Sequence, residues 1–279
     1  MREEAEAGSP RRRGALTVRV ASGVVFGAVA LALLLFRPYG LYALVAVVGG
    51  VALWEFRRLS EGMGWRAPAW LLYPLAAYFT VSGTLLPGLD LELALGAALV
   101  GGLVAFLFLP GRRDGLGRWA MAVAGALYIG IPFDFYLRLY ASSAGVRWVV
   151  FTLLAVVAAD TAALLVGMRF GRRPFFSRIS PHKTLEGALG GMAAAVVTMV
   201  VAASWGLGLA PWHGAALGAL AGAGAVAGDL VESQMKRIAE VKDAGRLIPG
   251  HGGALDRLDS ILFPGVAVYF YAHFAHLIR

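Results

Sequence analysis

The chain has 279 residues, of which 59% are hydrophobic and only 15% charged, and its formal net charge is +8. A soluble domain has about a quarter of its residues charged, so the composition excludes an ordinary soluble globular protein and favours a membrane protein. The absence of cysteine excludes disulfides and thiolate metal sites.

The N-terminal residues differ from the rest of the chain. Residues 1–14 are polar, and we expect them to form a disordered cytoplasmic N-terminus. The apolar run Val20–Phe36 is too long for the core of a signal peptide, and no cleavage site of small residues follows it. We therefore interpret this run as a retained first membrane span.

Apolar runs of similar length then follow one another along the chain. A spanning helix needs about 20 mostly apolar residues, and backbone polar groups cannot stay unpaired in lipid, so each run should be a helix. In chain order the runs are Val20–Phe36, Tyr42–Trp54, Ala67–Leu86, Leu91–Leu109, Trp119–Pro132, Trp148–Gly167, Gly187–Ala210, Trp212–Gly228 and Ile261–Ile278. The predicted fold is an all-α integral membrane protein, a polytopic bundle of about nine transmembrane helices.

Basic residues gather in alternate loops. They cluster before the first run and after the second, fourth, sixth and eighth, whereas the other loops hold only Arg37, Arg138 and Arg147. The positive-inside rule therefore places the N-terminus in the cytoplasm and the C-terminus on the far side. Topology and contact with anionic lipids account for the positive charge, so we expect no nucleic-acid partner.

The eighth run carries small residues at regular spacing. Gly214, Gly218 and Gly222 are four residues apart, as are Gly224 and Gly228. This spacing lets helix backbones approach closely, and it predicts tight packing of this helix. The same faces could pack within one chain or join two chains, so a homodimer stays open.

Two polar segments on the cytoplasmic side, 160–191 and 229–259, carry the candidate chemistry. The second holds eleven of the 42 charged residues. Its first part places four polar side chains on one helix face, at i, i+3, i+4 and i+7: Asp229, Glu232, Ser233 and Lys236. Such a face suits a metal–phosphate site, and it equally suits a solvated helix end with i,i+4 ion pairs.

A glycine-rich loop and two further carboxylates follow. The Gly-His-Gly-Gly run at 250–253 precedes a helix start and can present backbone N–H groups to an anion. Asp256 and Asp259 can be ordinary first-turn residues. Together with Asp229 they can instead hold Mg²⁺, which takes one or two carboxylates plus substrate phosphates.

Two acids lie within or at the end of apolar runs. Asp160 falls inside a run, and an intramembrane acid is a functional candidate unless a neighbouring helix pairs with it. Asp134 has Arg138 four residues later, which predicts an interfacial salt bridge outside the site.

The order and spacing of these polar residues form an extended motif. It reads Ser233-Gln-Met-Lys236-Arg237, then Lys242-Asp243-Ala-Gly245, then Pro249-Gly-His251-Gly252-Gly253, and Asp256-Arg257-Leu-Asp259. This pattern resembles the signature of phosphatidate cytidylyltransferases, also called CDP-diacylglycerol synthases. The run Ser180-Pro181-His-Lys183-Thr184 resembles that family's second conserved region, although Leu164 replaces an expected tyrosine.

The resemblance implies an activity and a location. The implied enzyme is a nucleotidyltransferase of phospholipid biosynthesis that converts CTP and phosphatidate into CDP-diacylglycerol and pyrophosphate. Its site would face the cytoplasm of a bacterial-type inner membrane, with membrane lipids as further partners. The chain then divides into N-terminal transmembrane helices at 15–145 and a catalytic transmembrane region at 146–279.

The resemblance also assigns roles to individual residues. The implied ligands of Mg²⁺ are Asp229, Asp256, Asp259 and Asp160, and a second, monovalent cation stays open. The implied catalytic residues are Lys236, Arg237, Lys242, Asp243, His251 and Arg257. The implied substrate-binding residues are Ser180, Lys183, Thr184, Ser233, Gly252 and Gly253.

Three other functions compete with this one. A CTP-dependent polyprenol or phytol kinase is the nearest alternative. Such an enzyme would use a similar fold to phosphorylate a lipid alcohol. A transporter predicts broken helices in two symmetric halves, whereas here the polar residues gather in the C-terminal half. A CDP-alcohol phosphotransferase is rejected because its aspartate-rich motif is absent.

Overall fold

The structure is a computed structural model that describes residues 27–86, 91–108, 114–245 and 252–278. Within these ranges the secondary structure is helical and no strand is present. The all-helical prediction is therefore confirmed. The expectation for residues 1–14 lies outside the described ranges.

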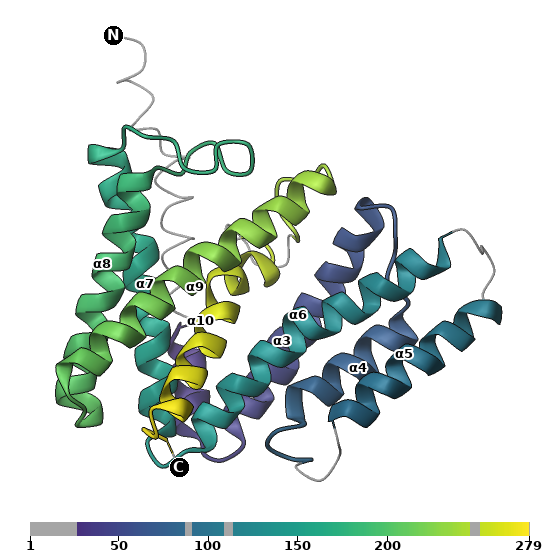
Figure 1. Cartoon of the computed structure of the whole chain (residues 1–279), viewed down its shortest axis with the longest axis horizontal. Coiled ribbons are helices and arrows are strands. Elements are labelled where there is room, and N and C mark those ends of the chain that lie inside the picture. Colours follow the sequence, from purple (N-terminus) through teal and green to yellow (C-terminus); the bar gives the residue numbers. More distant parts are fainter. Residues whose placement is uncertain (1–26, 87–90, 109–113, 246–251, 279) are drawn as a thin grey trace.

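Each predicted apolar run overlaps a helix. A helical stretch at 27–35 falls within the first run. The later elements, labelled as in Figure 1, are α3 (Gly40–Gly62), α4 (Ala69–Val81), α5 (Leu91–Phe108), α6 (Gly115–Ala141), α7 (Gly145–Phe170), α8 (Leu185–Val201), η1 (Ala202–Leu207), α9 (Pro211–Ile238) and α10 (Leu255–Phe274). Several helices extend past their apolar run, so charged residues such as Glu55 and Lys236 continue a helix.

Five helices in the described part of the chain are long and apolar enough to cross a membrane. They are α3, α6, α7, α8 continued by η1, and α9. α4 and residues 95–105 of α5 are shorter apolar helices. The chain is thus an integral membrane protein with a helical bundle.

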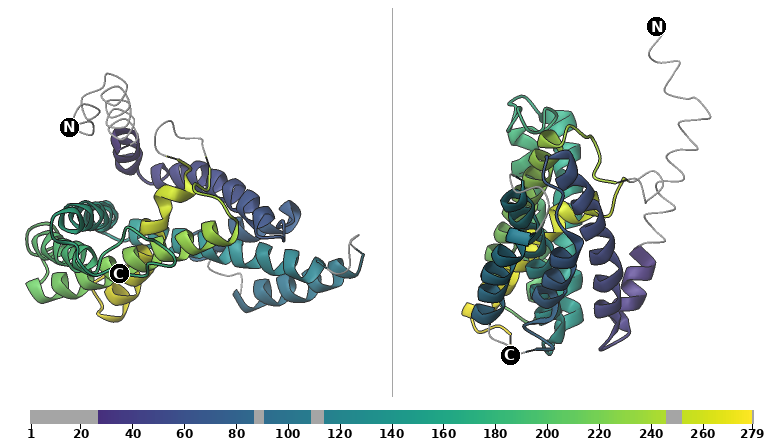
Figure 2. Two further views of the ribbon diagram at one scale, coloured as in Figure 1. Left: turned by 90° about the horizontal axis from the view of Figure 1, so that it is seen from above. Right: turned by 90° about the vertical axis from the view of Figure 1, so that its right-hand side faces the viewer.

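The helices pack in two groups joined by α6. α4 packs on α6 in one group, while α7, α8, α9 and α10 pack on one another in the other. Figure 1 shows α9 crossing the α7–α8 pair, with α4 and α5 at the opposite side of the molecule. α6 also contacts α7 and α10, and α3 contacts α10. Figure 2 shows the same arrangement from two further sides. The second group carries both polar segments.

The glycines of α9 explain how this helix fits between two neighbours. A Cβ atom on Gly214 would lie 2.5 Å from the Met199 carbonyl oxygen of α8, and one on Gly218 would overlap the α8 backbone. A Cβ on Gly228 would overlap the Asp259 carbonyl oxygen of α10. The predicted tight packing is confirmed, and both glycine faces are used within the chain.

The salt bridge between Asp134 and Arg138 is also confirmed. Arg138 Nε lies 2.7 Å from Asp134 Oδ2, and the Gly83 N–H donates to Asp134 Oδ1 at 3.0 Å. Asp134 therefore attaches the turn that follows α4 to helix α6.

Candidate active site

A pocket of about 650 Å³ lies among α7, α8, α9 and α10. Its polar wall combines three helices and the loop before α8, and includes Asp160, His182, Lys183, Thr184, Asp229, Asp256, Arg257, Asp259 and Ser260. The two polar segments predicted from the sequence therefore meet at one pocket.

Asp229 joins the two segments directly. Its carboxylate forms an ion pair with Lys183, and it accepts a hydrogen bond from Ser233 Oγ at 3.2 Å. Both partners of the ion pair are partly exposed to the pocket. A carboxylate, an ammonium and a hydroxyl are thus brought together, but the ammonium is that of Lys183 and not that of Lys236, which the sequence placed on the same helix face.

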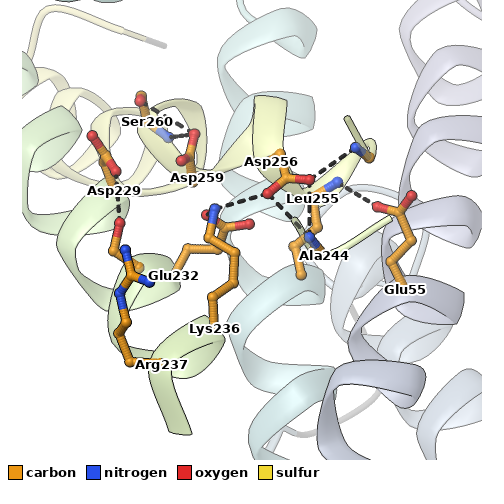
Figure 3. A network of polar contacts seen from close by, with 12 residues as sticks. Glu55, Asp229, Glu232, Lys236, Arg237, Ala244, Leu255, Asp256, Asp259 and Ser260 are labelled. Carbon is orange, nitrogen blue, oxygen red and sulfur yellow. Dashed lines mark hydrogen bonds and ion pairs between the residues drawn. The ribbon is translucent and has the colours of Figure 1, made fainter. Parts of the chain in front are cut away.

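Lys236 lies deeper and is held by two carboxylates. Its Nζ lies 2.5 Å from Glu232 Oε2 on the same helix and 2.8 Å from Asp256 Oδ1 on α10 (Figure 3). The Lys236 side chain is only 15% exposed and that of Glu232 is fully buried. The i,i+4 ion pair considered from the sequence is present, and Lys236 links α9 to α10.

Asp256 binds three donors of the protein. Besides Lys236, it accepts from the Ala244 N–H at 3.0 Å and from the Gly253 N–H at 2.8 Å. Asp256 lies in the first turn of α10, ahead of the apolar run that starts at Ile261. Burial raises the pKa of Asp256, but these donors outweigh it and hold the pKa below its usual value. The carboxylate is therefore kept ionised.

Asp259 and Asp160 lie beside Asp229. Asp259 is 8% exposed and accepts from the Ser260 N–H at 2.7 Å. Asp160, on α7, lines the same pocket as Asp229 and Asp259. Three carboxylates on α7, α9 and α10 therefore concentrate negative charge at one end of the pocket.

This donor set fits a hard divalent cation. Among the described residues no group of three or more His, Asp or Glu side chains is placed to hold a metal ion by itself. Mg²⁺ needs only one or two carboxylates, because substrate phosphates and waters supply the rest. Asp256 is already engaged by three donors and Asp259 is buried, so Asp229 and Asp160 are the more accessible part of the predicted ligand set.

Residues of the loop before α8 also make contacts that hold this loop in place. Thr184 caps α8, its Oγ1 accepting from the Gly187 N–H at 3.2 Å. Arg237 Nε donates to the Ile179 carbonyl oxygen at 3.1 Å, which ties this loop to α9. The Ser180 carbonyl oxygen accepts from the Lys183 N–H at 3.3 Å.

Other predicted residues are not among those that line the pocket. Lys242 and Asp243 are exposed and do not line it. Gly252 has a φ of +80°, a conformation that glycine adopts without strain. His251 lies outside the described residues.

The sequence interpretation missed several residues that the fold brings to the site. Ser260 and His182 are neighbours of residues it did select, and Glu55 comes from α3. Glu232 was part of the predicted polar helix face but was given no role of its own, and it pairs with Lys236. The signal for Glu55 was a carboxylate at the end of an apolar run, since acids at such positions are costly and commonly functional.

Comparison with known proteins identifies the family. Residues 17–275 match the model of the cytidylyltransferase family. A phosphatidate cytidylyltransferase of Mycobacterium bovis is 33% identical, over 91% of this chain and 87% of its own length. Proteins of the same name from Synechocystis and Bacillus subtilis are 32% and 30% identical, each covering 96% of the relative. The chain therefore belongs to the cytidylyltransferase family.

Proposed function

We propose that this chain is a phosphatidate cytidylyltransferase, which converts CTP and phosphatidate into CDP-diacylglycerol and pyrophosphate. The observation that carries the proposal is the pocket where Asp160, Asp229 and Asp259 meet Lys183 and Arg257. The name shared by the similar proteins supports the same reaction.

The two substrates are both anionic, which explains why cations gather at the pocket. An oxygen of the phosphatidate phosphate attacks the α-phosphorus of CTP, and the bond from that phosphorus to the β-phosphate bridge breaks to release pyrophosphate. The attacking oxygen is already ionised near neutral pH, so the step needs no strong general base. Such transfers depend on positioning and charge neutralisation, for which Lys183 and Arg257 are placed.

Mg²⁺ is the proposed cofactor. When bound at Asp229 with Asp160 or Asp259, it would neutralise charge on the triphosphate. Lys183 holds the Asp229 carboxylate, and Ser233 donates to it, so both residues orient this side chain.

The membrane setting suits a soluble nucleotide and a lipid. The pocket is also lined by exposed apolar side chains of α7, among them Leu164 and Met168, which would contact acyl chains next to the acidic end. We propose nine spans with the N-terminus and this pocket at the cytoplasmic side of the inner membrane, as the alternation of basic loops indicates.

The proposal is tested with the full chain in detergent or lipid nanodiscs. Phosphatidate and radiolabelled CTP should give labelled CDP-diacylglycerol, and EDTA should abolish the product until Mg²⁺ is restored. A product formed from a polyprenol or phytol, with none from phosphatidate, would instead identify the lipid-kinase alternative. An accessibility assay of cysteines placed singly in this cysteine-free chain tests the orientation.

A further inference from the structure

Glu55 is a buried carboxylate in the half of the chain that has no assigned chemistry. It lies on α3, 200 residues before its hydrogen-bond partner, and it is fully buried. Its Oε2 accepts from the Leu255 N–H at 2.8 Å, at the first residue of α10. A carboxylate without partners is costly to bury, so its surroundings indicate what it does.

Glu55 contacts two stretches of backbone that are separate in the sequence. A Cβ atom on Gly245 would overlap the Glu55 carboxylate, and one on Gly253 would lie 2.5 Å from both of its oxygens. Glycine at both positions leaves room for the Glu55 carboxylate in the place where it lies. Glu55 therefore reaches the stretch before residue 246 and the stretch after residue 251 at the same time.

Asp256 binds the same two stretches. It accepts from the N–H groups of Ala244 and Gly253, each next to or identical with a glycine that Glu55 contacts. Figure 3 shows Glu55 reaching this backbone from the α3 side, with Asp256 facing Lys236. Glu55 and Asp256 thus contact the same two backbone stretches, at residues 244–245 and 253–255, from two sides.

We propose that Glu55 is a positioning residue of the cytidylyl-transfer site, which fixes the start of α10 so that Asp256 and Asp259 keep their orientation. This inference rests on the proposed function for its kinetic part. Glu55 acts through the backbone at Gly245, Gly253 and Leu255, and it does not line the pocket. The N-terminal half then contributes to the geometry of the site.

Three full-length variants test the role. Glu55→Leu removes the acceptor, Glu55→Gln keeps an acceptor oxygen of the same reach, and Glu61→Leu is a control on the exposed part of the same helix. We expect Glu55→Leu to lower kcat/KM for CTP by about 10-fold or more, because the start of α10 loses an anchor and small displacements of site residues reduce the rate strongly. Glu55→Gln should recover to within about 3-fold of the original chain, because the Leu255 N–H keeps a partner. Glu61→Leu should be unchanged.

Hydrogen–deuterium exchange separates positioning from general loss of fold. In Glu55→Leu the amide of Leu255 should exchange faster, while α7 and α8 keep their protection. Unchanged exchange at Leu255, activity equal to that of the original chain, or loss of protection throughout the bundle would each overturn the proposal. If the original chain makes no CDP-diacylglycerol, the proposed function fails, and the exchange experiment still decides the role of Glu55.

Discussion

The ammonium of Lys236 donates to the carboxylate of Asp256 across the α9–α10 interface, with 2.8 Å between Nζ and Oδ1. The same ammonium pairs with the buried Glu232 at 2.5 Å. One cation therefore compensates two carboxylates and joins the Asp229 helix to the glycine-rich segment. Lys236 and Asp256, two residues of the motif described from the sequence, therefore also hold the site together.

Removing this cation should harm stability as well as activity. Lys236→Met keeps most of the side chain but leaves Glu232 buried without a counter-charge, which costs about 3–5 kcal/mol for a buried pair. The added change Glu232→Gln removes that uncompensated charge, so the double variant should be more stable than Lys236→Met alone. Thermal unfolding of the purified proteins measures both. A double variant no more stable than the single one would show that Glu232 does not depend on Lys236.

Asp229 should be required for catalysis and dispensable for folding. Asp229→Asn keeps the shape of the side chain but weakens its hold on Lys183 and on a divalent cation, so we expect kcat/KM to fall by about 100-fold or more. Asp114→Asn, at an exposed carboxylate without a cap hydrogen bond, is the matched control. Product formation at several Mg²⁺ concentrations measures the effect. Equal activity of the two variants would remove Asp229 from the site.

The close approach of α9 to α10 predicts a sensitive glycine. A methyl group on Gly228 would overlap the Asp259 carbonyl oxygen, so Gly228→Ala must push α9 and α10 apart. We expect a loss of about 1–3 kcal/mol in unfolding free energy, typical of overpacking, together with reduced activity because Asp229 and Asp259 separate. Gly50→Ala on α3 is the control, since a Cβ there meets no atom within 4 Å. A Gly228→Ala protein as stable and active as Gly50→Ala would contradict the packing described.

The salt bridge on α6 should affect stability alone. Asp134→Ala leaves Arg138 and the Gly83 N–H without their acceptor, which should cost about 1–3 kcal/mol. Neither residue of the pair lines the pocket. We therefore expect a lower unfolding temperature with kcat unchanged when both proteins are assayed well below that temperature. A specific loss of kcat in a protein that remains folded would place this pair in the catalytic machinery.

The sequence predicted the helices and the chemistry of the C-terminal region because these depend on local patterns. Long apolar runs must be helices in lipid whatever their neighbours are. The spacing of the polar residues from Ser233 to Asp259 can be read from the sequence alone, so the family could be inferred without knowing which side chains are in contact. The glycine stripe of α9 likewise predicted close packing, although not the helices that would receive each face.

The tertiary structure decided which polar groups share one environment. Nothing in the sequence pairs Glu55 with Leu255, because the hydrogen bond spans 200 residues and depends on how α3 packs on α10. The position of Lys236, four residues after Glu232, was compatible with a free cation or with an ion pair. Only the fold placed Asp256 within hydrogen-bond distance of its ammonium. Periodicity thus determined the elements and the motif, whereas long-range packing determined which charges are compensated, which face the pocket, and that the N-terminal half supports the site.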